Sequence, residues 1–186
     1  MKKYKYEIKI SGVGGQGIRT AGKILGLAAT IDHKFASVWT SYGVETRGGP
    51  STCDIIIASQ SIEFPRVISA DVLAVLDQNM LKDFLADLKP GGILIIDSDL
   101  VEDTPMRKDI IIDQLQLNRT AETLGQRLYT GMILCGALIA MTGIISKEAM
   151  LKAIPMELSA DAQKVNIQAF KKGLKLADNV KVKKIR

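Results

Sequence analysis

A glycine-rich segment near the amino terminus has the residue types and spacing to hold an anion. The sequence G-V-G-G-Q-G, from Gly12 to Gly17, follows an alternating apolar segment and precedes one of helical composition. In that setting Gly12 permits a tight turn, Gly14 lets a ligand approach the backbone, and Gly17 lets helix and strand pack closely. Because amides at a helix start attract phosphate or carboxylate groups, the segment predicts an anion or nucleotide site, or else a tight turn that simply needs glycine. The candidate binding residues are Gly12, Gly14, Gly15, Gln16 and Gly17.

The surrounding residues argue against a dinucleotide cofactor. A dinucleotide site usually places Asp or Glu at the end of the second strand, where the carboxylate holds the ribose hydroxyls. Here that strand ends in V-W-T-S, from Val38 to Ser41, without an acid, and Asp32 comes before it. No basic residue follows until Arg47, so an NADP site is no better supported. Since no catalytic histidine or Tyr-x-x-x-Lys pair occurs in a dehydrogenase setting either, a free-standing nicotinamide dehydrogenase is disfavoured.

A second segment, S-Y-G-V-E-T-R-G-G-P-S from Ser41 to Ser51, gathers an aromatic ring, a carboxylate, a guanidinium and three glycines. It follows a predicted strand, and ligands of open α/β sheets bind at the carboxyl ends of strands. We expect Arg47 to orient a carboxylate or phosphate by paired hydrogen bonds, with Glu45 fixing Arg47. The alternative is that Glu45 and Arg47 brace a structured loop or a subunit interface. The candidate residues here are Tyr42, Glu45, Arg47 and Gly48.

Metal chemistry is not expected of this chain. It has two cysteines, Cys53 and Cys135, and one histidine, His33. An iron–sulfur cluster usually takes four thiolates and a structural zinc ion four Cys or His ligands, so neither site fits. Both cysteines lie in apolar surroundings and are interpreted as small core residues, a usage that suits the reducing cytoplasm. No residue stands out as catalytic.

Apolar runs alternate with helical segments along the chain, which predicts a parallel sheet covered by helices. The expected fold class is therefore α/β, a Rossmann-like, mostly parallel sheet flanked by helices, in a single domain spanning 1–186, with a hairpin-like connection around the third strand. The expected strands are Tyr6–Ser11, Phe35–Thr40, Cys53–Ser59, Val72–Asp77 and Ile93–Asp97, with a short strand at Ile110–Ile112. The expected helices are Ile18–Thr30, Gln78–Leu88 (stopped by Pro90-Gly91-Gly92), Tyr129–Met141, Lys147–Ala153 and Gln163–Ala177.

The distribution of charge excludes some classes of partner. The net charge of +5 comes from a basic carboxy-terminal helix and tail, 163–186, and the rest of the chain is slightly acidic. Without interleaved aromatic residues, this segment is interpreted as a solvated face and not as a nucleic-acid site. The most apolar run, Gly131 to Ile145, is shorter than a bilayer requires and is expected to be a buried helix. The amino terminus has no secretory signal, so a cytoplasmic protein without membrane contact is expected.

Taken together, the two glycine-containing segments resemble the gamma subunit, or fused gamma domain, of the 2-oxoacid:ferredoxin (acceptor) oxidoreductases. The resemblance covers nearly the whole chain, from G-x-G-G-Q-G at Gly12–Gly17 through S-Y-G-x-E-x-R-G-G at Ser41–Gly49 to the apolar helix after Tyr129. Pyruvate-type chains more often read F-G-x-E-R-R-G-A at the second motif. The S-Y-G form with Thr46 before Arg47 favours the 2-oxoglutarate branch, and the pyruvate, branched-chain 2-oxoacid and indolepyruvate branches stay as alternatives.

The resemblance implies a non-autonomous enzyme subunit that is inactive when isolated. Its partners would be larger alpha and beta subunits, with a small ferredoxin-like delta subunit as a further candidate, and ferredoxin or flavodoxin as electron acceptor. Thiamine diphosphate, Mg²⁺ and the iron–sulfur clusters would belong to partner subunits, and coenzyme A (CoA) would be the co-substrate, released here as succinyl-CoA. The implied ligand-facing loops are Gly12–Gly17 and Tyr42–Gly49. A stand-alone nucleotide- or CoA-binding module remains the alternative from another functional class.

Overall fold

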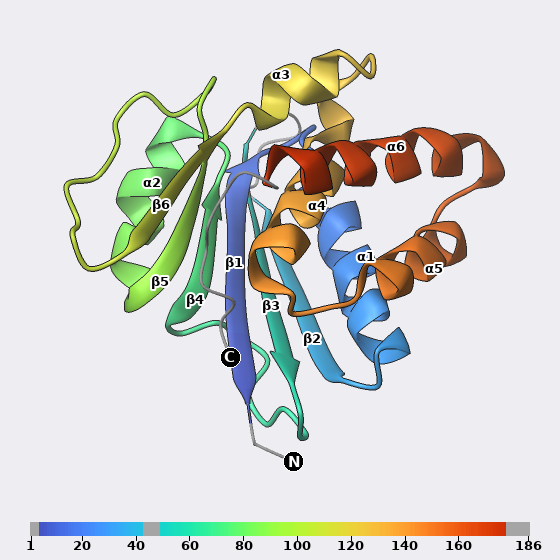
Figure 1. Cartoon of the computed structure of the whole chain (residues 1–186). Coiled ribbons are helices and arrows are strands. Elements are labelled where there is room, and N and C mark those ends of the chain that lie inside the picture. Colours follow the sequence, from blue (N-terminus) through green and yellow to red (C-terminus); the bar gives the residue numbers. More distant parts are fainter. Residues whose placement is uncertain (1–3, 43–48, 178–186) are drawn as a thin grey trace.

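The computed structural model describes residues 4–42 and 49–177, which form one six-stranded sheet with helices on both faces (Figure 1). The strand order is β2-β3-β1-β4-β5-β6. The strands are β1 (Lys5–Val13), β2 (Phe35–Tyr42), β3 (Pro50–Ala58), β4 (Ala70–Val75), β5 (Leu88–Asp97) and β6 (Ile111–Leu115). The helices are α1 (Ile18–Ile31), α2 (Gln78–Phe84), α3 (Leu117–Glu122), α4 (Thr130–Thr142), α5 (Lys147–Glu157) and α6 (Ala160–Leu176). Two 3-10 helices, η1 (Leu85–Asp87) and η2 (Arg127–Tyr129), complete the fold.

The sheet is mostly parallel, as the alternation of strands and helices predicts. Strands β1, β4, β5 and β6 pair in parallel, whereas β3 lies antiparallel between β1 and β2. The hairpin-like connection expected around the third strand is confirmed, because β2 leads into β3 and pairs with it from Phe35↔Ala58 to Tyr42↔Ser51. Both ends of the hairpin turn therefore stand at the carboxyl end of β1.

Alternation along the strands divides the apolar core into two layers. Ile8 and Ile10 of β1, with Ile55 and Ile57 of β3, belong to one core layer that also includes buried residues of α1, α4, α5 and α6. The intervening residues of the sheet, such as Ile56, face the side on which α2 lies over β4 and β5. Figure 1 shows the resulting asymmetry: α2 lies on one face of the sheet, and α1, α4, α5 and α6 lie on the other.

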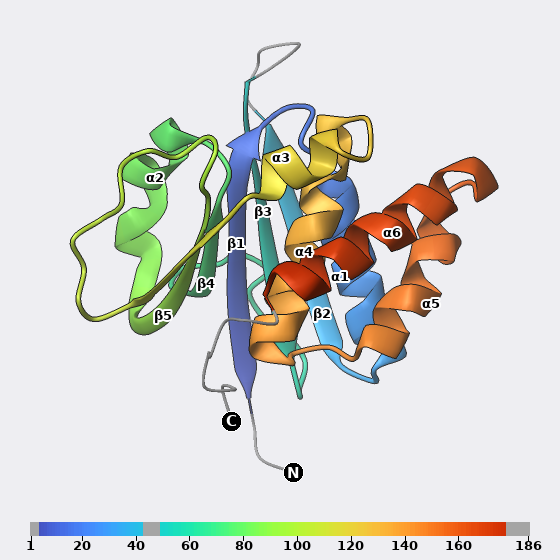
Figure 2. The same cartoon turned by 45° about the horizontal axis from the view of Figure 1, so that its top comes forward.

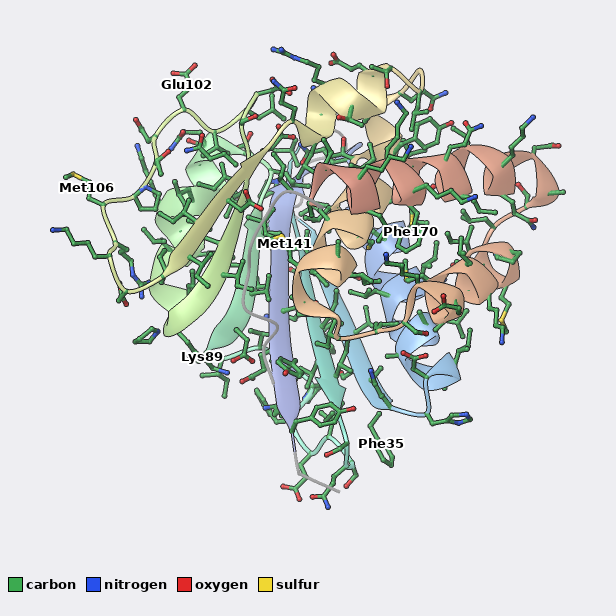
Figure 3. The ribbon with its side chains drawn as sticks, viewed as in Figure 1. Phe35, Lys89, Glu102, Met106, Met141 and Phe170 are labelled. Carbon is green, nitrogen blue, oxygen red and sulfur yellow. The ribbon has the colours of Figure 1, made fainter. Side chains whose placement is uncertain are left out.

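Helices α4 and α6 cross with their backbones in close contact. A Cβ atom added at Gly136 of α4 would overlap the carbonyl oxygen of Phe170, and one added at Gly173 of α6 would overlap that of Ile133. Phe170 fills the space beside the crossing and is fully buried (Figure 3). The apolar run after Tyr129 is thus a buried helix, as expected, and among the described residues no helix has the length and apolar character needed to cross a bilayer.

Several expected boundaries differ from the structure. Helix α2 ends at Phe84 and β5 already begins at Leu88, so Pro90-Gly91-Gly92 lies inside a strand and does not form a turn. Gly91 has a left-handed φ of 76°, which lets the strand accommodate an irregularity in its pairing with β4. The short helix α3 was not expected, because L-N-R-T-A-E, from Leu117 to Glu122, has no apolar periodicity. Helix α5 continues to Glu157, with Pro155 in its last turn.

Candidate functional site

The glycine loop and the described ends of the second segment, 41–42 and 49–51, lie at the same end of the sheet as the carboxyl end of β1 (Figure 2). Gly12 lies within β1, paired with Ser51, so the loop proper begins after Val13. The N–H of Gly14 donates to the carbonyl of Gly49 at 3.0 Å, which ties the glycine loop to the end of the second motif. Gly14 and Gly15 are exposed. Where both motifs are described, their backbones are therefore in direct contact.

Gln16 braces the loop from inside. Its side chain is fully buried, with Oε1 accepting the N–H of Val13 at 2.8 Å and Nε2 donating to the carbonyl of Leu76 at 2.9 Å. A Cβ atom at Gly12 would overlap Oε1 of Gln16, so glycine is needed there to make room for this side chain. Both polar ends of Gln16 are thus used to fix the loop to the end of β4, and the surface offered outward is that of Gly14 and Gly15.

Gly17 begins α1 in a left-handed conformation, with φ of 70°. A Cβ atom there would overlap the carbonyl oxygen of Leu128, and the N–H of Gly131 donates to the carbonyl of Gln16 at 2.9 Å. The close packing expected at Gly17 therefore involves η2 and the start of α4, not the strand. The small cavity of about 150 Å³ beside it is lined mainly by apolar side chains, among them Leu128 and Met132.

Part of the second motif lies outside the described residues. Glu45, Arg47 and Gly48 belong to 43–48, and the interpretation of Arg47 as an anion ligand stays a prediction. Tyr42 is the last residue of β2, and its backbone is paired with Ser51. The structure thus places Gly49 against the glycine loop, and Tyr42 one strand further away, across β3.

Asp32, which precedes β2, is engaged in a structural role. Its carboxylate accepts the N–H and the hydroxyl of Ser146, both at 2.6 Å, and pairs with Lys34 at 3.6 Å. Burial alone would raise the pKa of Asp32, but the hydrogen bonds from Ser146 and the charge of Lys34 lower it overall. Asp32 therefore joins the end of α1 to the start of α5.

The cysteines are core residues, as expected. Cys53 and Cys135 are both fully buried, and desolvation by burial raises the pKa of each thiol to about 12. Neither therefore supplies a thiolate. Among the residues that the structure describes, no group of three or more His, Cys, Asp or Glu side chains is placed to hold a metal ion.

Asp97 is a buried carboxyl group at the carboxyl end of β5 that was not singled out from the sequence. Its oxygens accept the N–H groups of Asp99 at 3.1 Å and Asn118 at 2.9 Å. Burial raises the pKa of Asp97 to about 6, against the opposing effect of the two hydrogen bonds. The sequence does carry a signal for this residue. An acid that directly follows the apolar run I-L-I-I is expected at the carboxyl end of a buried strand.

Asp97 should make the free energy of unfolding decrease as pH rises. Because its pKa is raised in the folded state to about 6, its contribution to the unfolding free energy is lost as pH rises from about 4 to about 6. Asp97→Asn cannot ionise and should lack this component. We expect the stability of the wild type relative to Asp97→Asn, from urea unfolding between pH 4 and 7, to fall as pH rises. A constant difference between the two proteins across this range would contradict the prediction.

The face of β1 opposite α1 carries a buried stripe of charged residues that alternation alone would have left exposed. Lys9 Nζ pairs with Asp54 Oδ1 at 3.0 Å, with only 7% of the Lys9 side chain and 2% of the Asp54 side chain exposed. The other Asp54 oxygen accepts Arg66 Nε at 2.9 Å and the N–H of Val67 at 3.2 Å. The connection between β3 and β4 therefore lies over this part of the sheet and buries the pair.

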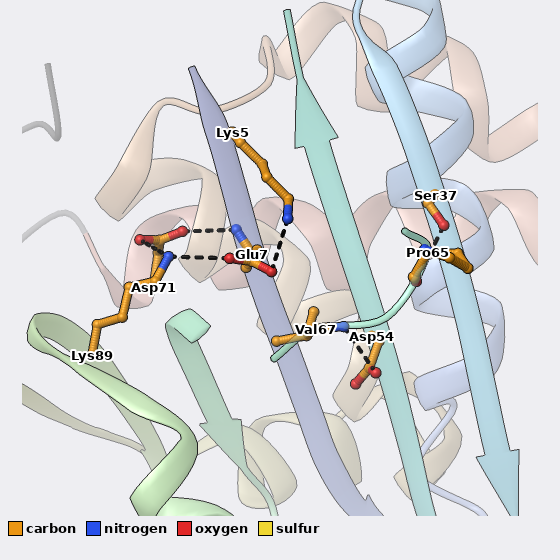
Figure 4. Close-up of polar contacts among 8 residues, drawn as sticks. All are labelled: Lys5, Glu7, Ser37, Asp54, Pro65, Val67, Asp71 and Lys89. Atoms are coloured by element: carbon orange, nitrogen blue, oxygen red, sulfur yellow. Dashed lines mark hydrogen bonds and ion pairs between the residues drawn. The ribbon is translucent and has the colours of Figure 1, made fainter. Parts of the chain in front are cut away.

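A second network lies nearer the start of β1 (Figure 4). Lys89 contacts Asp71 at 2.8 Å and Glu7 at 3.3 Å, and Lys5 contacts Glu7 at 3.2 Å. Asp71 also accepts the backbone N–H of Glu7 at 2.8 Å. These contacts hold β1, β4 and β5 together near the starts of the strands, at the end of the sheet away from the glycine loop, so we assign them a structural role.

Comparison with known proteins gives concordant matches. The family model described as pyruvate ferredoxin/flavodoxin oxidoreductase matches residues 7–176. A 2-oxoglutarate synthase subunit KorC from Methanocaldococcus jannaschii is 39% identical, over 94% of this chain and 95% of that protein. The keto/oxoacid ferredoxin oxidoreductase gamma subunit from Geobacter sulfurreducens superposes with a TM-score of 0.82 at 35% identity, over 94% of this chain and 97% of that one. A chain of the 2-oxoglutarate:ferredoxin oxidoreductase from Magnetococcus marinus, solved with 2-oxoglutarate, coenzyme A and succinyl-CoA, has the same fold (TM-score 0.88, 19% identity); the match covers 100% of this chain and 33% of that chain.

Proposed function

The chain belongs to the pyruvate ferredoxin/flavodoxin oxidoreductase family as a gamma-type, non-autonomous subunit, and from this premise we propose that its enzyme converts 2-oxoglutarate and CoA into succinyl-CoA. The observation that carries the choice of substrate is the 39% identity, over nearly the full chain, to a 2-oxoglutarate synthase subunit. The S-Y-G form of the second motif supports the same choice. Because the family model is described for pyruvate, pyruvate is the principal competing substrate.

The chemistry of bond cleavage is assigned to partner subunits. When bound, thiamine diphosphate with Mg²⁺ would supply the cleavage of the 2-oxoacid, and iron–sulfur clusters would supply electron transfer to ferredoxin or flavodoxin. The residues of this chain do not fit an iron–sulfur cluster, because its two cysteines are buried in the core and it has a single histidine. Among the described residues, no group of three or more His, Cys, Asp or Glu side chains is placed to hold Mg²⁺ either. The larger alpha and beta subunits are therefore the proposed holders of these cofactors, with a ferredoxin-like delta subunit as a further partner. The proposed location is the cytoplasm, where ferredoxin and flavodoxin are found.

The part we propose for this chain is to present two loops at the carboxyl end of β1 to CoA and the partner subunits. Gly14 and Gly15 are exposed there, and the N–H of Gly15 has no hydrogen-bond partner among the described residues. Backbone amides in such a turn suit a phosphate or pyrophosphate group, such as that of CoA. Arg47, held by Glu45, would add a bidentate contact to the same anion. Gln16 keeps the loop in shape through its bonds to Val13 and Leu76.

Arg47→Lys tests this role. Lysine keeps the charge but lacks the planar fork that binds two oxygens at once. In the assembled enzyme we expect the KM for CoA to rise about tenfold or more, corresponding to about 1.4 kcal/mol or more, while the KM for the 2-oxoacid changes little. Steady-state rates at varied CoA measure this directly. If the enzyme assembles fully and its CoA kinetics are unchanged, Arg47 does not bind CoA, and a structural role within its loop is the remaining interpretation.

The proposed function as a whole is tested by purifying the tagged chain from its native cell. We expect two larger subunits, thiamine diphosphate and iron in the same fraction, with dye reduction that requires both 2-oxoglutarate and CoA. Faster turnover of pyruvate, a branched-chain 2-oxoacid or indolepyruvate would overturn the substrate. Recovery of the chain alone, with tight CoA or adenine nucleotide binding, would instead support the stand-alone module.

A further inference from the structure

A small cavity of about 150 Å³ opens beside the glycine loop, where residues of α1, η2, α4 and α6 come together. Helix α4 packs against both α1 and α6 here (Figure 1). The apolar part of the lining comes from Ala21, Leu128, Met132, Leu158 and Ala162. Leu128 is 51% exposed, so the cavity is open to solvent on the η2 side. An apolar cavity of about this volume is large enough to receive a small ring. We refer to it as the α1–α6 cavity.

Asn166 of α6 brings a buried amide into this apolar lining. The residue is only 9% exposed. Its Nδ2 donates to the carbonyl of Ala162 at 2.8 Å, but that carbonyl already belongs to the hydrogen-bonded ladder of α6, so the fold does not depend on this bond. Within the described part of the chain, Oδ1 accepts no hydrogen bond and the second N–H of Nδ2 donates none. Since buried polar groups are normally paired, these two unused positions indicate a ligand group.

The unused positions on Asn166 match one edge of adenine. An asparagine amide binds adenine by two hydrogen bonds, with Oδ1 accepting from the 6-amino group and Nδ2 donating to N7. The bond from Nδ2 to Ala162 fixes which end of the amide is the acceptor. A purine with an oxygen at position 6 would therefore set one acceptor against another. Tyr129 and Met132 also line the cavity, and aromatic rings and thioethers make favourable contacts with a planar base.

The adjoining glycine loop supplies the second half of a nucleotide site. Gly14 and Gly15 are exposed, and the N–H of Gly15 is one of the loop amides that suit a phosphate group. Gly17 belongs both to the glycine loop and to the lining of the α1–α6 cavity. A base held in the cavity is therefore next to the loop that would hold its phosphates.

We propose that the α1–α6 cavity binds the adenine ring of a nucleotide whose phosphates lie at the glycine loop, and that Asn166 selects adenine. The identity of the nucleotide rests on the function proposed above, which makes it CoA. The cavity then adds a base-specific contact to a loop that by itself recognises only an anion.

The test compares adenosine diphosphate (ADP) with inosine diphosphate (IDP), which carries an oxygen in place of the 6-amino group. Calorimetric titrations use the full chain, alone and in its assembled enzyme. We expect the wild type to bind ADP about tenfold more tightly than IDP, and Asn166→Leu to bind the two equally. Gln168→Leu makes a similar change at an exposed position of the same helix and should keep the wild-type preference. Because the preference compares two ligands on one protein, partial unfolding of a variant does not mimic its loss.

CoA is examined in the same proteins. We expect CoA to displace ADP, and Asn166→Leu to raise the KM for CoA about tenfold while the KM for the 2-oxoacid is unchanged. If the preference for ADP depends on Asn166 but CoA neither displaces ADP nor changes its KM, the cavity binds a free adenine nucleotide and CoA is not its ligand.

Two further outcomes separate this proposal from the proposed function. If the wild type binds ADP and IDP equally, or binds neither, the α1–α6 cavity is not an adenine site, although an enzyme that consumes 2-oxoglutarate and CoA keeps its function. If the chain forms no oxidoreductase but selects ADP through Asn166, the proposed function fails and the adenine site stands.

Discussion

The Asp54→Ala variant is expected to lose about 3–5 kcal/mol of unfolding free energy, because it leaves the ammonium group of Lys9 buried without its closest partner. The Lys9 side chain is 7% exposed, and Asp87, the other acid near it, lies at 3.6 Å and is itself partly solvated. The Phe84 ring, 4.9 Å from the Lys9 ammonium, offsets only part of the loss. Urea unfolding monitored by circular dichroism measures the change.

Two further variants show whether burial of the charge is the cause. Asp109→Ala removes the carboxylate of an exposed ion pair with Arg107 and should change the unfolding free energy far less than Asp54→Ala does, because solvent screens exposed pairs. Lys9→Met combined with Asp54→Leu removes both charges of the buried pair and should recover most of the stability lost in Asp54→Ala. If Asp54→Ala costs no more than Asp109→Ala, the pair is not the buried contact described above.

Gly173→Ala is expected to destabilise the protein by about 1–3 kcal/mol, although alanine is the better helix former by about 1 kcal/mol. The added Cβ would overlap the carbonyl oxygen of Ile133, which belongs to the backbone of α4 and has no rotamer to adopt. The two helices must separate to accept the methyl group, and the contacts of Phe170 loosen with them. Thermal or urea unfolding of the variant is the measurement.

The control for Gly173→Ala is Lys175→Ala in the same helix, where the side chain is exposed and the change should stay within about 0.5 kcal/mol. Gly136→Ala should be destabilising in the same way, since its Cβ would meet the carbonyl of Phe170. Because both substitutions separate the same pair of helices, the double variant should cost less than the sum of the two. If the Gly173→Ala protein is as stable as the wild type, the crossing of α4 and α6 accommodates a methyl group at this position and the backbones are not in the close contact described above.

Sequence patterns predicted those parts of the fold that depend on neighbouring residues. Alternating and continuous apolar runs placed β1 to β5 in order, and the long amphipathic or apolar helices were found with ends displaced by a few residues. Helix α3 was missed because its six residues depend on tertiary contacts, among them the bond from the N–H of Asn118 to Asp97 at 2.9 Å. A short segment without periodicity gives no local signal of that kind.

The position of the glycine loop was predictable, but its internal contacts were not. The glycine pattern between a strand and a helix located the loop after β1, whereas its bond from Gly14 to Gly49 came only with the structure. The pattern leaves the residue at Gln16 unspecified, however, and its partner Leu76 is distant in sequence. The burial of Lys9 and Asp54 likewise depends on a connection that crosses the sheet later in the chain. Contacts of this kind are fixed by the assembled fold and have no signature within a short window.

The position of β3 between β1 and β2 has a consequence for the order in which the chain folds. β1 leaves the ribosome first, yet its neighbours are β3 on one side and β4 on the other, with Ile8 opposite Ile55 and Val72. The β2–β3 hairpin closes a short loop and can form early, whereas β1 must wait for partners synthesised much later. Until they arrive, its isoleucine stripe is exposed on the nascent chain. Folding should therefore be limited by the docking of the hairpin onto β1, and β1 is the segment that a chaperone would bind during synthesis.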